Sequence, residues 1–152
     1  MAKRDLYDML SQLQSSQESH FGLGWLRLFY LFGVGQAPTA LYSQLLASLH
    51  NGSETFDMSM GDQVRDFLDI RVAAEYIAKI VVYSNNVGCV NICSGEPVSV
   101  LDKVLAWLSE RQSNISLNRG VYPYPDYEPF AFWGSTEKLN QLRGRWSNHF
   151  HS

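Results

Sequence analysis

The residues best suited to chemistry in this sequence lie in a polar turn that leads into a short apolar segment. This run, residues 61–70, reads GDQVRDFLDI. An arginine held by a strand can bind a phosphate through two parallel hydrogen bonds, which a flexible lysine cannot do with the same geometry. We therefore predict an anion site at Arg65, with Asp66 supporting the turn and orienting the arginine. The alternative is a surface arginine paired with Asp66 or Asp62.

Composition and charge limit the classes of protein to which this chain can belong. The chain has 152 residues, 45% of them hydrophobic and 13% aromatic, as expected for one globular domain. Its net charge is -3 and its basic residues are scattered, which argues against a nucleic-acid partner. The apolar stretches at 25–34 and 77–83 are too short to span a bilayer, and the N-terminus has no apolar signal core. We expect a soluble cytoplasmic protein with no membrane partner.

The two cysteines, Cys89 and Cys93, fall within an apolar segment that reads as a strand. Reduced, buried thiols are the expected state in a protein of this kind. A metal site would need more ligands nearby, and none of the four histidines is placed to help. We predict no metal.

Helical and extended patterns alternate along the chain. Helices are predicted near 6–13, 38–49, 73–80, 99–108 and 135–142, and strands near 25–32, 56–58, 64–70, 89–93 and 115–117. The strand at 25–32 is expected to be buried on both faces, as in a parallel sheet. Residues 121–133 hold three prolines and six aromatics and should form an ordered loop. This alternation indicates the α/β class.

Two local signals refine this outline. Ser99 is a good helix N-cap with Asp102 three positions later, and Asp69 is a candidate cap for the helix that follows it. By contrast, no glycine-rich strand-to-helix turn precedes an acidic residue, so the chain is not expected to bind a dinucleotide by that route.

Several motifs in order carry a family resemblance: residues 27–33 (RLFYLFG), 61–67 (GDQVRDF), 91–95 (NICSG), 99–100 (SV) and 128–133 (EPFAFW). Together they resemble the C-terminal half of extended short-chain dehydrogenases/reductases, the NAD-dependent epimerase/dehydratase family. The chain is most similar to bacterial enzymes that reduce or epimerise a 4-keto-6-deoxy sugar on a nucleoside diphosphate for surface polysaccharide. The resemblance implies a single partial domain over 1–152. Residues 1–35 would be the remnant of the Rossmann half, its active-site helix and following strand, and 36–152 mainly the substrate-binding region.

For the cofactor, the resemblance implies NAD or NADP in the intact enzyme and none bound by this chain alone. Lys3 matches the family's active-site lysine, which holds the nicotinamide ribose and lowers the pKa of a catalytic tyrosine four residues earlier; that tyrosine would precede Met1. Phe29 matches a position beside the nicotinamide. The alternatives are a solvated lysine on a frayed helix for Lys3 and a core aromatic for Phe29.

For the substrate, the resemblance implies that Arg65 pairs with the diphosphate of a nucleotide sugar. Tyr30 stands where many relatives have an asparagine that contacts the nucleotide. Tyr124 and Trp133 lie in the loop that closes over the nucleotide in relatives, although no arginine occurs between Gly120 and Arg143. The alternative for the loop is a proline-rich lid packed on the core.

The sequence thus predicts a truncated nucleotide-sugar oxidoreductase or epimerase that is inactive alone and forms a homodimer when intact. The alternative is a non-catalytic module that binds a nucleotide sugar or pairs with a separate Rossmann polypeptide. In either case the strand at 25–32 would lack neighbours, and an exposed apolar edge favours aggregation or pairing.

Overall fold

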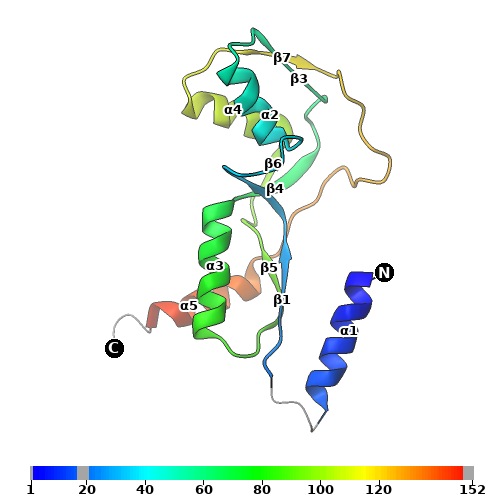
Figure 1. Cartoon of the computed structure of the whole chain (residues 1–152), viewed down its shortest axis with the longest axis vertical. Helices are drawn as coiled ribbons and strands as arrows, with labels where there is room; N and C mark the ends of the chain where they lie inside the picture. The colour runs from blue at the N-terminus through cyan, green and yellow to red at the C-terminus, as the bar shows by residue number, and fades with distance from the viewer. Residues whose placement is uncertain (1, 17–20, 149–152) are drawn as a thin grey trace.

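The computed structural model describes residues 2–16 and 21–148. In chain order the elements are α1 (Ala2–Ser15), β1 (Gly24–Leu28), β2 (Tyr30–Phe32), α2 (Leu41–His50), β3 (Thr55–Met58), β4 (Val64–Asp69), α3 (Ile70–Tyr83), β5 (Gly88–Ile92), β6 (Pro97–Ser99), α4 (Val100–Glu110), β7 (Ser116–Arg119) and α5 (Glu137–Asn148). The chain is α/β, as predicted. Figure 1 shows these elements spread along one long axis, with β2, β4 and β6 between the two ends.

One end of the molecule is built on a parallel strand pair. β1 pairs with β5 in a register that places Leu26 opposite Val90, and α3 and α5 pack beside the pair. Buried residues of α3, β5 and α5, with Leu68 of β4, form the first core, which includes Leu68, Ala73, Ile80, Val90, Ile92, Leu139, Leu142 and Trp146. Apolar side chains on a helix stripe and a strand face are removed from water together, which is the main favourable term in folding.

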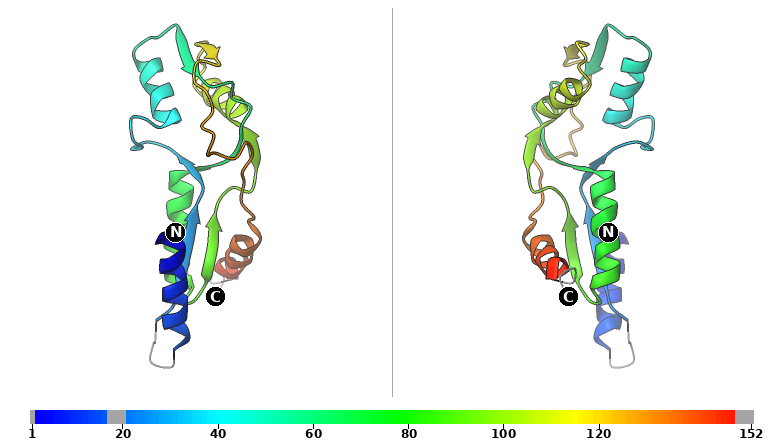
Figure 2. Two further views of the ribbon diagram at one scale, coloured as in Figure 1. Left: turned by 90° about the vertical axis from the view of Figure 1, so that its right-hand side faces the viewer. Right: turned by 90° about the vertical axis from the view of Figure 1, so that its left-hand side faces the viewer.

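The other end holds the second core, between α2, α4 and the parallel pair of β3 and β7. Its centre is Trp107, which is 1% exposed and makes ring contacts with Phe32, Tyr42 and Phe67. Three rings around one indole bury a large apolar area in tilted and edge-on contacts, the geometries that aromatic pairs prefer. The side views in Figure 2 show α2 and α4 covering this end.

The predicted strand at 25–32 is wrong in one respect, because it is divided between two sheets. β1 pairs with β5, whereas β2 pairs in parallel with β4, and Phe29 lies between the two strands. The expectation of burial on both faces is also wrong, since no residue of β1 or β2 is fully buried and Leu28 is 51% exposed. Among the described residues, β1 has a strand neighbour on one edge alone.

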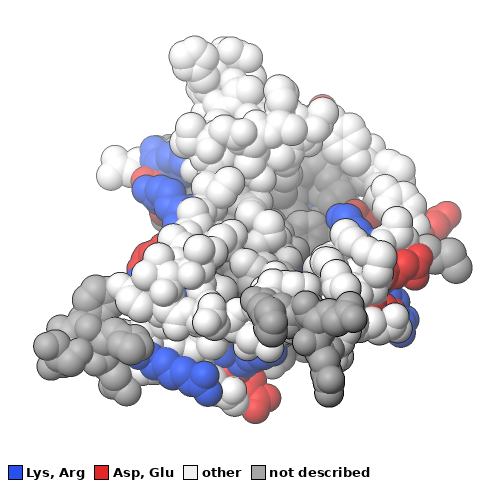
Figure 3. Space-filling view, turned by 60° about the horizontal axis from the view of Figure 1, so that its bottom comes forward, with Lys and Arg blue, Asp and Glu red and all other residues white. Residues whose placement is uncertain are grey.

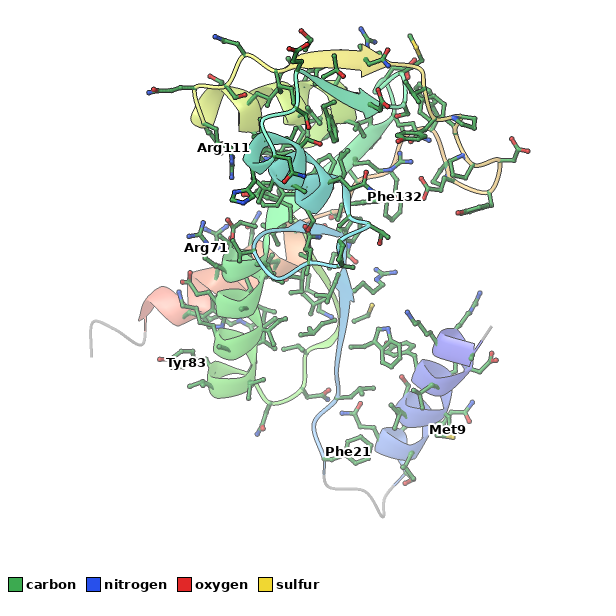
Figure 4. The ribbon with its side chains drawn as sticks, turned by 45° about the horizontal axis from the view of Figure 1, so that its top comes forward. Met9, Phe21, Arg71, Tyr83, Arg111 and Phe132 are labelled. Atoms are coloured by element: carbon green, nitrogen blue, oxygen red, sulfur yellow. The ribbon has the colours of Figure 1, made fainter. Side chains whose placement is uncertain are left out.

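α1 lies beside the outer edge of β1 (Figure 1) and touches it through a ring contact between Tyr7 and Trp25, whose centroids are 5.4 Å apart. No described residue of this helix is buried. Figure 4 shows Met9 on the side of α1 that is turned away from β1, and its side chain is 56% exposed. The helix predicted at 6–13 is therefore present, with much of its apolar face in solvent.

Both predicted helix caps are confirmed. The Ser99 hydroxyl accepts a hydrogen bond from the Asp102 backbone N–H at 2.9 Å and donates one to the Asp102 carboxylate at 2.6 Å. The Asp69 carboxylate accepts a hydrogen bond from the Arg71 backbone N–H at 2.8 Å. Each cap satisfies a backbone donor that the first helical turn cannot pair internally.

The remaining elements follow the sequence with shifted bounds. The last helix continues to Asn148 instead of ending near Leu142, because Leu142 and Trp146 both reach the first core. Both cysteines are free thiols; Cys93 is buried, as predicted, whereas Cys89 is only half-buried. The division of the chain at residue 35 stays a prediction.

Within 2–16 and 21–148, the structure has no helix with the length and apolar character that a bilayer span requires.

Candidate functional site

A cavity of about 550 Å³ opens where β2, α2 and β4 meet the loop that follows β7. Apolar and aromatic side chains make most of its wall, and its polar lining includes Gln36, Gln44, Asp57, Gln63, Arg65 and Glu128. A concave, largely apolar site with a few convergent polar groups is the usual form of a small-molecule site. This cavity is the candidate site.

Arg65 is fixed on the wall of this cavity and is 2% exposed. Its Nη1 donates to the backbone carbonyls of Val64 at 2.8 Å and Phe130 at 3.0 Å, and its Nη2 donates to Glu128 Oε2 at 2.9 Å. The guanidinium carbon also lies 5.3 Å from the centre of the Tyr30 ring. The guanidinium is thus held from several sides, as a rigid anion-binding group requires.

Two sequence interpretations around Arg65 are corrected by these contacts. The alternative of a surface arginine paired with Asp62 or Asp66 is wrong, since the arginine is buried and its partner is Glu128. The role of Asp66 as the group that orients Arg65 is also wrong. Asp66 is 0% exposed and its carboxylate instead accepts hydrogen bonds from the loop that holds Ser94. Both errors have one cause, because the true partners lie far away in the sequence.

Of the other residues predicted to touch the nucleotide, Tyr30 lines the cavity, whereas Tyr124 and Trp133 are not among its lining residues. The Tyr124 hydroxyl donates to the Asp62 carboxylate and accepts from the Asp62 backbone N–H at 3.2 Å. Trp133 is 53% exposed. The structure therefore brings Arg65 and Tyr30 together and leaves the other two outside the cavity. Their contacts with a nucleotide stay predictions.

The two residues predicted to contact the cofactor lie elsewhere. Lys3 lines a second hollow of about 790 Å³ between α1 and β1, together with Tyr7 and Trp25. Phe29 lies between β1 and β2 and stacks on Phe132 with ring centroids 4.9 Å apart. Neither residue lines the Arg65 cavity. Their roles stay predictions.

Sequence reasoning missed most of the residues that line the cavity, among them Gln63, Trp107 and Glu128. Gln63 is 7% exposed and lines the cavity. The buried Trp107 Nε1 has no hydrogen-bond partner among the described residues. Glu128 was noted only as part of a motif. Gln63 had a signal, since it sits in the same polar turn as Arg65, but the other two are brought to the cavity by tertiary contacts alone.

Basic and acidic side chains are mixed on one face of the molecule. On the face drawn in Figure 3, basic side chains are separated by acidic and uncharged ones. A nucleic-acid surface needs a continuous basic stripe, because its affinity comes from neutralising many phosphates at once.

The fold of this chain is similar to that of several solved structures. An NAD-dependent NDP-hexosamine 5,6-dehydratase of tunicamycin biosynthesis superimposes with a TM-score of 0.75 at 24% identity, covering 91% of this chain and 44% of that protein. A UDP-N-acetylglucosamine 4-epimerase from Methanobrevibacter ruminantium, in complex with UDP-N-acetylmuramic acid, gives 0.75 at 16% identity, covering 92% and 45%. The chain has the fold of the nucleotide-sugar epimerases and dehydratases.

A curated relative supports the same family by sequence. The dTDP-6-deoxy-L-talose 4-dehydrogenase (NAD+) of Aggregatibacter actinomycetemcomitans is 27% identical over 121 residues, which cover 80% of this chain and 44% of the relative. No family model matches the sequence. The predicted resemblance to NAD-dependent epimerases and dehydratases is confirmed. The chain spans less than half the length of each of these three relatives.

Proposed function

We propose that this chain is the substrate-binding part of an NAD(P)-dependent nucleotide-sugar oxidoreductase or epimerase, and that Arg65 binds the diphosphate. The observation that carries the proposal is a buried guanidinium on the wall of a cavity of about 550 Å³ in this fold. A charge-assisted hydrogen bond from a fixed arginine is about twice as strong as a neutral one. The apolar wall beside it suits the rest of a bound nucleotide.

The proposed substrate is a 4-keto-6-deoxy sugar on a nucleoside diphosphate, used for surface polysaccharide. Support for this sugar class comes from the relative named a dTDP-6-deoxy-L-talose 4-dehydrogenase. Tyr30 would lie against the nucleotide, since its ring faces the Arg65 guanidinium in the cavity. Tyr124 and Trp133 would reach the nucleotide only after the loop at 121–133 moves inward.

The proposed cofactor is NAD or NADP, which supplies or accepts the hydride when bound. The residues that we propose for its nicotinamide end are Lys3, which lines the hollow between α1 and β1, and Phe29, which lies past the end of β1 and outside that hollow. Lys3 would hold the nicotinamide ribose. The described residues include no G-x-G-x-x-G turn between a strand and a helix, so they do not account for binding of the cofactor's pyrophosphate. We therefore infer that this chain binds no cofactor alone and that its proton and hydride transfers need groups outside it.

A non-catalytic binding or interaction module is the second candidate. The observation that favours it is the exposed apolar surface around α1 and β1, where Leu13 and Leu28 are 52% and 51% exposed. Exposed apolar residues next to an open strand edge favour pairing with another chain. Such a module would bind nucleotide sugars without turning them over, whether or not a second polypeptide completes the sheet.

The test is calorimetric titration of the purified chain with dTDP, UDP, GDP and CDP sugars, followed by an assay of each with NADH and NADPH. The proposal predicts saturable binding of at least one nucleotide sugar and no turnover by the chain alone. Arg65→Lys should weaken that binding by more than tenfold, from the ~1.5 to 3 kcal/mol of a charge-assisted hydrogen bond. Turnover by the isolated chain would overturn its inactivity, and unchanged affinity in Arg65→Lys would overturn the phosphate role.

A further inference from the structure

We propose that Glu128 determines which anions the cavity accepts, because its carboxylate occupies the position at Arg65 that a ligand phosphate would take. Glu128 Oε2 lies 2.9 Å from Arg65 Nη2, and both residues line the cavity. A carboxylate and a phosphate offer the same kind of acceptor oxygens to a guanidinium. The inference rests on the proposed function, since it assumes that a phosphate-bearing ligand enters this cavity.

The two partners of this ion pair differ in mobility. The Arg65 side chain is 2% exposed and its Nη1 is fixed by the carbonyls of Val64 and Phe130. The Glu128 side chain is 33% exposed, so its carboxylate can turn into water without being desolvated. An arriving anion therefore displaces the glutamate and leaves the arginine in place.

The loop around Glu128 allows this exchange without coming apart. On one side the Tyr124 hydroxyl is bonded to the turn at Asp62. On the other side the Val64 backbone N–H donates to the Phe130 carbonyl at 3.0 Å, and the Phe132 N–H donates to the Val64 carbonyl at 3.0 Å. Because the loop is held on both sides of Glu128, by a side chain at Tyr124 and by its backbone at Phe130 and Phe132, release needs only a change of the Glu128 rotamer.

The charges in the cavity give the exchange its selectivity. Of the described residues that line it, Arg65 is the single cation, while Asp57 and Glu128 are carboxylates. A bare phosphate or pyrophosphate must replace the Glu128 carboxylate and gains little else in return. A nucleotide also gains contacts of its base and ribose with the apolar wall. Glu128 therefore weakens the binding of every anion by a similar factor, so that free phosphates no longer bind appreciably while nucleotides, which also contact the apolar wall, still do.

The experiment is calorimetry on the full chain and on Glu128→Gln, with UDP, dTDP, pyrophosphate and uridine as ligands. Glutamine keeps an acceptor for Arg65, so this variant should fold, and Glu128→Ala provides a second route to the same result. Asp126→Asn is the matched control, since it removes one negative charge from the same loop at an exposed position. We expect both Glu128 variants to bind pyrophosphate and the nucleoside diphosphate at least tenfold more tightly, with uridine unchanged and Asp126→Asn within about threefold of the parent chain.

The outcomes separate the inference from the proposed function. If the parent chain binds UDP or dTDP but the Glu128 variants bind pyrophosphate no better than Asp126→Asn does, the selective role of Glu128 is wrong and the proposed function stands. If the parent chain and every variant fail to bind either nucleotide, the proposed function is wrong and the inference falls with it.

Discussion

The Asp66 carboxylate accepts a hydrogen bond from the backbone N–H of Gly134 at 3.2 Å, across 68 positions of sequence. The same carboxylate accepts from the Ser94 backbone N–H and hydroxyl, each at 2.7 Å, and from the Gly95 N–H at 2.9 Å. One buried charge thus joins β4 to the loop after β5 and to the segment that leads into α5. Arg65, its neighbour in sequence, faces the cavity instead.

Asp66→Asn should lower the free energy of unfolding by about 2 to 4 kcal/mol. Asparagine keeps the shape of aspartate but turns one acceptor into a donor and removes the charge, so several buried N–H and O–H donors lose a strong partner. Urea denaturation followed by tryptophan fluorescence measures the change. Asp126→Asn, at an exposed position of the aromatic loop, is the control and should change stability by less than about 0.5 kcal/mol. Equal stability of the two variants would refute the structural role of Asp66.

Cys93 should resist alkylation in the folded protein. Burial, and then the charge of Asp66, raises the pKa of the Cys93 thiol to about 11, and the thiolate is the reactive form. At mildly alkaline pH, iodoacetamide should modify the half-buried Cys89 first and reach Cys93 only after unfolding. Mass spectrometry of the digested protein reads out the order. Rapid modification of Cys93 in the native state would contradict its burial.

The raised pKa of Cys93 also predicts a loss of stability at alkaline pH. The folded-state pKa of about 11 lies above the ordinary value of 9.0, so the contribution of Cys93 is complete below pH 9.0 and is lost as the pH rises through about 11. Unfolding free energies measured across that range should fall less steeply in Cys93→Ser than in the parent chain. If the unfolding free energies of the two proteins fell equally with pH, the predicted contribution of the Cys93 thiol would be wrong.

Asp69→Ala should destabilise the start of α3 by about 1 kcal/mol, the usual value of an N-cap. Hydrogen bonds from Arg71 lower the pKa of Asp69 below 3.8, so its stabilisation is complete above that pH and is lost as the pH falls through the lowered value. Urea melts at neutral and strongly acidic pH should show a difference between variant and parent only at neutral pH. Arg71→Ala is the control and should cost less, because that side chain is 87% exposed.

What the sequence could predict depends on how far apart the interacting groups lie. The caps at Ser99 and Asp69 are set by residues two or three positions away, so their chemistry was visible in the sequence. The division of the strand at Phe29 was not, because it arises when the chain changes its partner from β5 to β4. A local apolar run does not specify which strand will pair with it.

The candidate site divides in the same way. Arg65 was found because its type and its position after a polar turn are local features. Its partner Glu128 is 63 positions away, and the three segments joined by Asp66 are brought together only by the fold. Tyr124 was expected over the nucleotide but is bonded to Asp62, a contact that spans 62 positions. Sequence therefore located the buried arginine of the cavity but did not identify the groups that hold it.

The most direct test of the central claim is a nitrogen–proton NMR titration of the full chain with dTDP and UDP, observing the indole N–H of each tryptophan. Trp107 Nε1 is buried beside the cavity without a partner among the described residues, whereas Trp146 belongs to the first core and is an internal control. A ligand bound at Arg65 should shift the Trp107 signal in a saturable way and leave Trp146 unchanged. The absence of any saturable shift at Trp107, or shifts confined to Trp25 beside α1, would contradict a nucleotide site in this cavity.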